Sequence, residues 1–356
     1  MKPQNLRSLT SLRGVAAWWV VLYHFQDSFS NHTPQYFTNL IDRGYLAVDF
    51  FFILSGFVIQ LNYGKYFRQD LKTNYIDFCL KRIARIYPLH LFILFLFIAN
   101  FLAIYFFSSS KDLHSRYDAL YFIYSIFLVQ NWGFSSNLQW NIPSWSISTE
   151  LGAYLMFPVI SYYLSKIRIF KTMHFFALVA IALLGLAYFY YANKYLSLGD
   201  DIPKTGLFRC IVEFLVGILA AKHFEKNGMP IFHSHLVFLF GVLTLFLGNL
   251  YDFKNYTYIP ASFFFFILAF TNSDFIFSKL LEGRIIHYLG EISYSTYLIH
   301  YFAKDWVKFL SKDLNLYSLT YYIAAIFIAS ICLHRFLEKP AQHIFYQKFK
   351  YRFKRS

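Results

Sequence analysis

The sequence predicts an all-α polytopic membrane protein of about ten transmembrane helices plus one re-entrant helix. Composition is the first reason. Of the 356 residues, 57% are hydrophobic, 23% are aromatic and only 15% are charged, whereas a soluble domain carries about 25% charged residues. The second reason is that apolar runs of membrane-spanning length recur along the whole chain. The third is that basic residues gather between these runs.

Eleven apolar segments are candidates for membrane helices, and charge decides which of them cross. The segment 118–131 is too short for a comfortable span, which needs about 20 residues. We therefore expect a re-entrant helix there, which leaves ten of the eleven segments as crossings. The segments lie near residues 10–28, 45–63, 86–107, 118–131, 147–165, 173–192, 206–223, 232–250, 256–271, 292–310 and 317–337.

The basic segments predict that both termini are cytoplasmic. Residues 65–85 hold six Lys and Arg against two acidic residues, and such an excess places a segment in the cytoplasm. The connections 193–205 and 251–255 have balanced charge and are expected outside. The other segments expected on the cytoplasmic side, each with at least two Lys or Arg residues, are 166–171, 222–231, 272–291 and the tail, at about 339–356.

Several protein classes are excluded by the sequence. Arg13 lies within the first apolar run and no small-residue cleavage site follows, so this run is not a cleaved signal peptide. Cys79, Cys210 and Cys332 form no CxxC pair, which indicates neither a disulfide framework nor a metal site. The net charge of +14 lies in the connections, which argues against a nucleic-acid partner. We expect one integral-membrane domain over residues 1–356.

Arg13 and His24 are the first candidate site residues. Ionisable groups within membrane segments are costly, face the protein interior and usually mark function. The two are eleven residues apart, which at about 100° per residue places both on one helix face, about 16 Å apart. Each alone has a plain alternative, a snorkelling arginine or a structural histidine. Their shared face favours a function.

Asp49 and the pair Ser55-Gly56 lie in the second segment, 45–63. A buried Asp without an adjacent cation needs a partner, and we expect Arg13 or His24 to supply it. The alternative is an Asp at the membrane–water boundary. Ser55-Gly56 indicates close helix packing more than catalysis, because small residues let helix backbones approach each other.

Arg82 and Arg85 lie at i and i+3, on one helix face, at the cytoplasmic end of the third span. Two guanidinium groups on one face suit the recognition of phosphate. The alternative is ordinary positive-inside anchoring, which explains the neighbouring Lys81 well. His90 follows five residues after Arg85, and we expect it to face the same interior.

Glu150 lies about one turn into the segment 147–165, behind a connection without charges. A carboxyl group at that depth is either neutral or paired. We expect Trp140, just before this segment, to belong to an interfacial aromatic belt.

Two stretches near the C-terminus carry further polar residues. Glu291 opens the segment 292–310, and His300 lies within it among Ser and Tyr residues that suit polar contacts between helices. Glu338, Lys339 and Pro340 close the last segment.

Six stretches together resemble the membrane-bound acyltransferase family 3, the O-acetyltransferases of bacterial surface polysaccharides. They follow the family's order and cover nearly the whole chain. The stretches are LRGVAAWWVVLYHF, VDFFFILSGFVI, KRIARIYPLH, WSISTE, LGEISYSTYLIH and the closing EKP. The resemblance implies ten spans in a bacterial inner membrane and an acyl-CoA donor, by default acetyl-CoA, reached from the cytoplasm. The implied acceptor is a hydroxyl of a carbohydrate such as O-antigen or exopolysaccharide.

By this resemblance, Arg13 and His24 match the family's essential pair, and Arg82 and Arg85 match its basic motif. Glu150 matches the acid of the family's Trp-Ser-x-Ser-x-Glu motif. Many relatives also carry a C-terminal hydrolase-like domain, so we expect this chain to act alone or with a separate periplasmic partner.

Acyl transfer to an alcohol needs a base for the hydroxyl proton and positive groups for the developing oxyanion. His24 is the best base, and either Glu150 or Asp49 is expected to orient its second nitrogen. In an alternative mechanism, His24 accepts the acyl group transiently and passes it outward. The residues expected to hold the phosphates of the donor are Arg13, Arg82 and Arg85.

A transporter or flippase of a lipid-linked glycan is the competing class, since polar groups along spans also describe carriers. Neither an inverted repeat nor a pair of broken helices is visible in the sequence. A purely structural role would leave the intramembrane charges unexplained.

Overall fold

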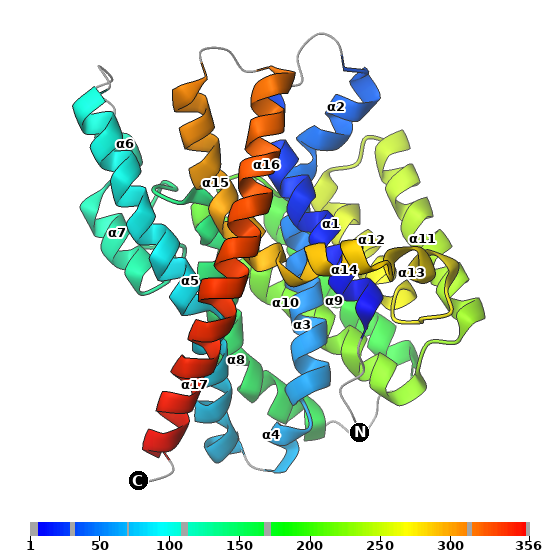
Figure 1. Ribbon diagram of the computed structural model, residues 1–356. Helices are drawn as coiled ribbons and strands as arrows, with labels where there is room; N and C mark the ends of the chain where they lie inside the picture. Colours follow the sequence, from blue (N-terminus) through cyan, green and yellow to red (C-terminus); the bar gives the residue numbers. More distant parts are fainter. Residues whose placement is uncertain are drawn as a thin grey trace. The chain divides into compact units, whose positions relative to one another are not determined.

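The protein is built from helices, as the sequence predicts. The computed structural model describes residues 6–28, 33–69, 71–107, 113–166, 172–311 and 315–353. Within these ranges every regular element is helical and none is a strand (Figure 1). Lys2, Asp70, residues 167–171 of the basic segment 166–171, and the last three residues of the tail lie outside the described ranges.

The chain divides into two compact units. The first unit consists of Met1–Val15, Leu46–Phe78 and Gly152–Glu291, and the second of Ala16–Tyr45, Cys79–Leu151 and Ile292–Ser356. Three α-helices in the described part of the chain contribute residues to both units: α1 (Arg7–Tyr23), α5 (Leu71–Phe107) and α8 (Trp145–Lys166).

The first unit is centred on α3 and α10, which pack closely together. A Cβ atom added at Gly56 of α3 would lie 2.0 Å from the carbonyl oxygen of Phe214, and one added at Gly217 of α10 would lie 1.9 Å from that of Ile53. This contact confirms the prediction that Ser55-Gly56 reflects helix packing. The helices are α3 (Ala47–Tyr63), α4 (Tyr66–Gln69), α9 (Thr172–Ala192), α10 (Ile202–Asn227), α11 (Ile231–Leu250), α12 (Asn255–Ala269), α13 (Ile276–Leu281) and α14 (Arg284–Glu291).

In the second unit, α15 lies beside α16, and α17 continues from the end of α16 (Figure 1). The five residues that join α16 to α17 form a π-helical segment, His334–Glu338, a rare form that is frequent at functional sites. The remaining elements are η1 (Gln26–Ser28), α2 (Gln35–Asp42), η2 (Gly44–Leu46), α6 (Leu113–Arg116), α7 (Ala119–Ile126), η3 (Ile142–Ser144), α15 (Ser293–Leu310), α16 (Leu316–Leu333) and α17 (Lys339–Phe353).

The basic segment 65–85 forms helix rather than a loop. Residues 71–85 are the first turns of α5, which continues as one helix of 37 residues through Pro88. Neither Gly nor Pro occurs between Leu71 and Tyr87, so nothing in this stretch interrupts the helix. Arg82 and Arg85 are therefore held at a fixed helical spacing.

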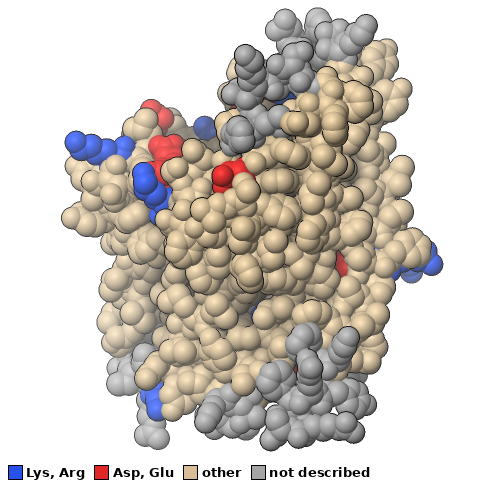
Figure 2. Space-filling view, turned by 90° about the vertical axis from the view of Figure 1, so that its left-hand side faces the viewer, with Lys and Arg blue, Asp and Glu red and all other residues tan. Residues whose placement is uncertain are grey.

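Large apolar side chains are exposed along α5 and α7. Figure 2 shows a face of the molecule on which Lys, Arg, Asp and Glu are sparse. Such a surface is unfavourable in water but is what lipid tails require, in agreement with a membrane protein. The exposed residues on these two helices include Phe95, Phe106, Phe107, Leu120 and Ile123.

Five helices in the described part of the chain are long and apolar enough to cross a bilayer: Gln35–Tyr63, Asn74–Phe107, Met173–Ala192, Ile231–Leu250 and Tyr317–Gln347. The helices at the other predicted crossings are too short or too polar to be counted with these five. In particular, α10 carries Arg209 and Glu213 within its apolar run. The eight residues of α7 are far fewer than the roughly 20 needed for a span. The number of crossings, the re-entrant helix and the orientation of the termini stay predictions.

Candidate active site

His24 follows directly on α1, which is unbroken from Arg7 to Tyr23. Its ring Nδ1 lies 3.0 Å from the carbonyl oxygen of Val20. A carbonyl oxygen can only accept a hydrogen bond, so Nδ1 carries the proton and donates it. The lone pair of the neutral ring is therefore on Nε2, and Nε2 is the atom that can act as a base or nucleophile.

The imidazole of His24 is half-buried among other rings of the second unit. The ring of His300 on α15 lies 4.9 Å from it, centroid to centroid, that of Tyr301 5.4 Å and that of Tyr23 5.0 Å. These contacts hold the ring of His24 from several sides. The sequence placed His300 in the stretch LGEISYSTYLIH but gave it no role.

The expectation that an acid orients the second nitrogen of His24 is wrong, because that nitrogen already has a backbone partner. The backbone carbonyl of Val20 accepts the hydrogen bond from Nδ1. In a catalytic triad, an orienting carboxylate accepts that hydrogen bond. A helix already offers this carbonyl four residues earlier, so the ring needs no acidic partner to fix its tautomer.

The expected partner of Asp49 is also wrong. In the first unit, both carboxylate oxygens of Asp49 accept hydrogen bonds at 2.6 Å from Nε and Nη2 of Arg209 on α10. Both side chains are fully buried, and Nη1 of Arg209 donates to the carbonyl oxygen of Leu198 at 2.7 Å. Arg209 fits because its planar fork matches a carboxylate in a bidentate pair. Arg209 and the buried Glu213, two charged residues within the apolar segment 206–223, are the signal that the sequence analysis overlooked.

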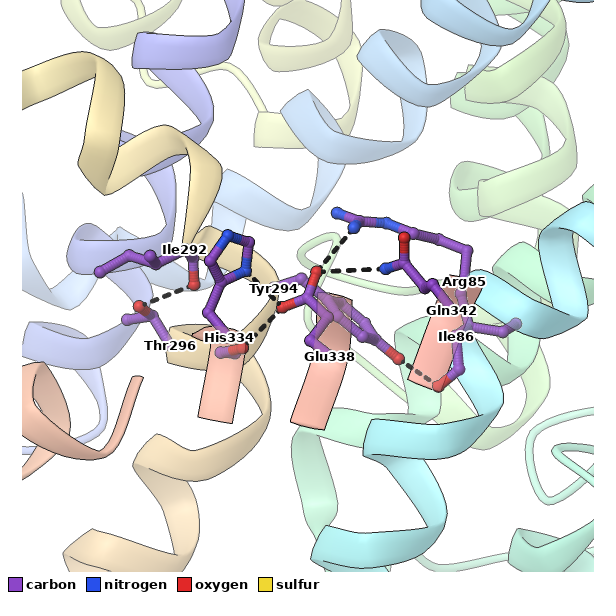
Figure 3. A network of polar contacts seen from close by, with 9 residues as sticks. Arg85, Ile86, Ile292, Tyr294, Thr296, His334, Glu338 and Gln342 are labelled. Atoms are coloured by element: carbon purple, nitrogen blue, oxygen red, sulfur yellow. Dashed lines mark hydrogen bonds and ion pairs between the residues drawn. The ribbon is translucent and has the colours of Figure 1, made fainter. Parts of the chain in front are cut away.

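Arg82 and Arg85 lie on α5. The guanidinium of Arg85 is not wholly available to bind phosphate, because it already has a protein partner. Its Nη1 donates to Oε1 of Glu338 at 2.6 Å (Figure 3). The side chain of Arg85 is 30% exposed while that of Glu338 is 1% exposed. In the described part of the chain, Nε and Nη2 of Arg85 make no further hydrogen bond. Part of this guanidinium therefore stays available to a ligand.

Glu338 is the centre of the network drawn in Figure 3. It accepts hydrogen bonds from the hydroxyl of Ser295 at 2.6 Å and from Nδ1 of His334 at 3.0 Å, besides the ion pair with Arg85. The hydroxyl of Tyr294 next to Ser295 donates to the carbonyl oxygen of Ile86 at 2.6 Å. The closing EKP stretch thus ties α5, α15 and the π-helical segment together, a role that spacing in the sequence could not reveal.

Glu150 is half-buried on the second turn of α8. The serines around it have structural roles: Ser146 contacts the hydroxyl of Tyr297 at 2.8 Å, and Ser148 donates to the carbonyl oxygen of Leu128 at 2.9 Å. The Trp-Ser-x-Ser-x-Glu stretch therefore anchors the start of α8 and presents Glu150 from a fixed helix.

The prediction for Trp140 is wrong. Its side chain is 7% exposed and packs against Phe122 and Tyr117 at ring distances of 4.6 and 4.9 Å. The indole N–H donates to the carbonyl oxygen of Asp118 at 2.8 Å. Because the backbone carbonyl of Asp118 satisfies the indole N–H, Trp140 needs no position at the membrane interface.

His90 is buried and has a structural contact. Its Nε2 lies 2.8 Å from the carbonyl oxygen of Ser125, so it donates there and joins α5 to the end of α7. Arg13 is half-buried on α1 and belongs to the first unit, whereas His24, Arg82, Arg85 and Glu150 belong to the second.

A group of charged residues missed by the sequence analysis lies along the second half of α15. Asp305 pairs with Arg116 and accepts a hydrogen bond from Asn100 at 3.1 Å. The ammonium group of Lys304 lies 4.6 Å from the ring centroid of Tyr301, the same ring that contacts His24. Among the residues that the structure describes, no group of three or more His, Cys, Asp and Glu is arranged to hold a metal ion.

Comparison with known proteins gives a match along most of the chain. A family model described as an acyltransferase domain matches residues 6–334. The O-acetyltransferase OatA of Staphylococcus aureus is 27% identical over 368 residues, which cover 95% of this chain and 57% of that protein. The chain therefore spans little more than half the length of this relative.

A second relative is matched over almost its full length. The acyltransferase MdmB of Streptomyces mycarofaciens is 27% identical over 382 residues, 97% of this chain and 94% of that protein. A protein of the picA locus of Rhizobium radiobacter is 39% identical over 104 residues, 29% of this chain and 49% of that protein. No solved structure matches the chain.

Proposed function

Because the chain belongs to the membrane-bound acyltransferase family 3, whose model covers residues 6–334, we propose that it transfers an acetyl group from cytoplasmic acetyl-CoA to a hydroxyl of a cell-surface or lipid-linked carbohydrate. Membership of this family makes the chain an acyltransferase and favours this function over the carrier that the sequence left as the alternative. The name of its Staphylococcus aureus relative, an O-acetyltransferase, supports acetyl as the acyl group and oxygen as the acceptor atom.

The observation that carries the proposal is the state of His24. Its Nδ1–H donates to the carbonyl oxygen of Val20, which leaves the lone pair on Nε2. An imidazole in this tautomer can take the proton of an attacking hydroxyl, or can attack the thioester carbonyl itself. His24 is thus the group that performs the transfer.

The arginines on α5 bind the phosphates of the donor in this proposal. Arg82 and Arg85 lie one turn apart on the same helix, and the N–H groups of Arg85 not used by Glu338 remain for a ligand. A CoA thioester carries its phosphates at one end of a long arm and the reacting carbonyl at the other, so the phosphate site and His24 need not be adjacent. Arg13 stays the third candidate for the donor site.

Of the two acids considered for catalysis, Glu150 is the better candidate. Asp49 is fully buried and already accepts hydrogen bonds from Nε and Nη2 of Arg209, so it stabilises the first unit. Glu150 is half-buried on α8, and in this proposal its carboxylate stabilises the positive charge that develops on the imidazole of His24 during transfer.

The remaining parts of the proposal concern place and partners. The protein acts in the bacterial inner membrane with both termini in the cytoplasm, so that the donor site faces acetyl-CoA. The acceptor is an O-antigen, an exopolysaccharide or a similar carbohydrate, delivered on the outer side with or without a separate periplasmic protein. The charged and aromatic residues of α15 around Tyr301 and Lys304 suit a hydroxyl-rich acceptor.

The test is binding of acetyl-CoA to the purified protein in detergent. Arg82→Ala is the informative variant, because Arg85→Ala would also break the ion pair with the buried Glu338 and weaken the fold. Loss of one charge-assisted contact costs about 1.5–3 kcal/mol, so the Kd should rise about 10-fold to 150-fold. Lys81→Ala, a neighbouring cation on the same helix, is the control and should bind nearly as the wild type does. Equal effects of the two variants, or absence of binding to folded wild type, would contradict the proposed donor site.

A further inference from the structure

His300 is a second imidazole beside His24, in the same unit and in the same tautomer. Its Nδ1 lies 2.6 Å from the carbonyl oxygen of Tyr297, so Nδ1 donates and the lone pair is on Nε2. The ring is completely buried, and in the described part of the chain its Nε2 has no hydrogen-bond partner.

An unpartnered buried nitrogen is unusual. Leaving a buried polar atom unsatisfied costs about 1–3 kcal/mol, and most such atoms in folded proteins find a partner. His90 and His334 in the same unit likewise have one ring nitrogen bonded to a backbone or carboxylate oxygen and one without a partner, but among the described residues the structure shows no ring contact between either of them and another histidine. Only His300 in the described part of the chain combines a free Nε2 with a ring contact to His24, at 4.9 Å between centroids.

We propose that His24 carries the acyl group on its Nε2 and that His300 is the base that removes the proton of the acceptor hydroxyl. This inference rests on the proposed function and decides between the two mechanisms that the sequence left open. Once the acyl group occupies Nε2 of His24, that nitrogen has no lone pair for a proton, and Nδ1 is already protonated. A second base is then required, and His300 is the neighbour that supplies one.

The steps balance as follows. Nε2 of His24 attacks the thioester carbonyl, the carbon–sulfur bond breaks, and CoA leaves as the thiolate. The acyl-imidazolium that results keeps its Nδ1–H on the carbonyl oxygen of Val20. The acceptor oxygen then attacks the acyl carbon while Nε2 of His300 takes the hydroxyl proton, and the bond between carbon and Nε2 of His24 breaks. The proton on His300 passes through water to the thiolate, so the sum is ester plus CoA thiol.

Isotope exchange separates the two half-reactions. The purified protein is given acetyl-CoA and radiolabelled CoA, and exchange of label between them reports acylation of His24 alone. Discharge is measured with three probes: water and glycerol, whose O–H groups need a base, and hydroxylamine, which attacks an acyl-imidazole without one.

The variant is His300→Asn, whose amide can keep the hydrogen bond of Nδ1 to Tyr297 but offers no Nε2. We expect label exchange and acetohydroxamate formation within a few-fold of the wild type, and discharge to water or glycerol reduced by about 100-fold or more, the usual contribution of a general base. His24→Ala should lose all of these activities. His90→Gln, in which an amide can keep the hydrogen bond of Nε2 to Ser125, is the matched control and should lose none.

Three results would overturn the assignment. If His300→Asn loses label exchange, hydroxamate formation and discharge to water or glycerol to the same extent, His300 has a structural role. Undiminished discharge would show that another base acts. A wild type that consumes acetyl-CoA without exchanging label would show direct transfer, in which case the proposed function stands and the acyl-histidine does not. A wild type with neither activity would contradict the proposed function itself.

Discussion

At the scale of single residues, Glu338 and Arg85 form an ion pair that joins the π-helical segment to α5 in the second unit. Glu338 is almost completely buried, whereas Arg85 reaches the surface. Removing one partner of a buried pair is costly because the other charge stays behind without compensation. The cost should therefore depend on which partner is removed.

We expect Arg85→Met to destabilise the protein by about 3 kcal/mol, the lower end of the range for a broken buried pair, since Ser295 and His334 still donate to Glu338. Arg85→Met/Glu338→Leu should regain part of this loss, because no buried carboxylate remains. Thermal unfolding of the single and double variants in detergent measures both effects. A double variant less stable than Arg85→Met would contradict this account of the pair.

The sequence indicated which polar side chains are candidates for the site, but it did not always predict which residues they contact. Asp49 was expected to find its partner in Arg13 or His24, yet it binds Arg209, which lies 160 residues later in the chain, and the ring of His24 is held by the backbone. A long-range ion pair has no sequence period, and a carbonyl acceptor is present at every residue. Tertiary contacts of this kind appear only once the helices are packed.

At the scale of helices, α3 and α10 approach at two glycines, Gly56 and Gly217. An added Cβ would fall within 2.0 Å of a backbone oxygen at each of them, and backbone cannot move aside as a flexible side chain can. Sequence pattern was sufficient here, because a small residue next to Ser within an apolar run already indicated close packing.

We expect Gly56→Ala and Gly217→Ala each to destabilise the protein by about 1–3 kcal/mol, as overpacking does. Gly185 in the middle of α9 is the matched control, since a Cβ there meets nothing within 4 Å, and alanine is a better helix former than glycine. Gly185→Ala should leave the apparent Tm unchanged or slightly raised. Equal losses in all three variants would argue against a backbone contact between α3 and α10.

At the scale of the whole molecule, composition predicted the all-helical membrane class, which the structure confirms, whereas the orientation inferred from charge stays a prediction. Helix ends were harder to predict: the basic stretch before the third span continues that helix toward its N-terminus, and much of the basic tail is α17. Positive charge marks the side of the membrane and says little about whether the backbone is helical, because Lys and Arg are good helix formers.

The orientation predicts a labelling pattern. In a variant without its native cysteines, Asp252→Cys lies in the connection 251–255, expected outside, and Gln347→Cys lies in the tail. Both positions are exposed. A maleimide that cannot cross membranes should label Asp252→Cys in intact cells and Gln347→Cys only after the membrane is permeabilised. Labelling of both from the same side would contradict the predicted topology.

The most direct measurement is turnover of acetyl-CoA by purified His24→Ala, followed by release of the CoA thiol. If Nε2 of His24 performs the transfer, the rate should fall by at least about 100-fold, while the protein stays folded and inserted. His174→Ala, at an exposed position of α9, is the control and should keep the wild-type rate. A His24→Ala protein that retains turnover within a few-fold of wild type would contradict the assignment of His24 as the reacting group.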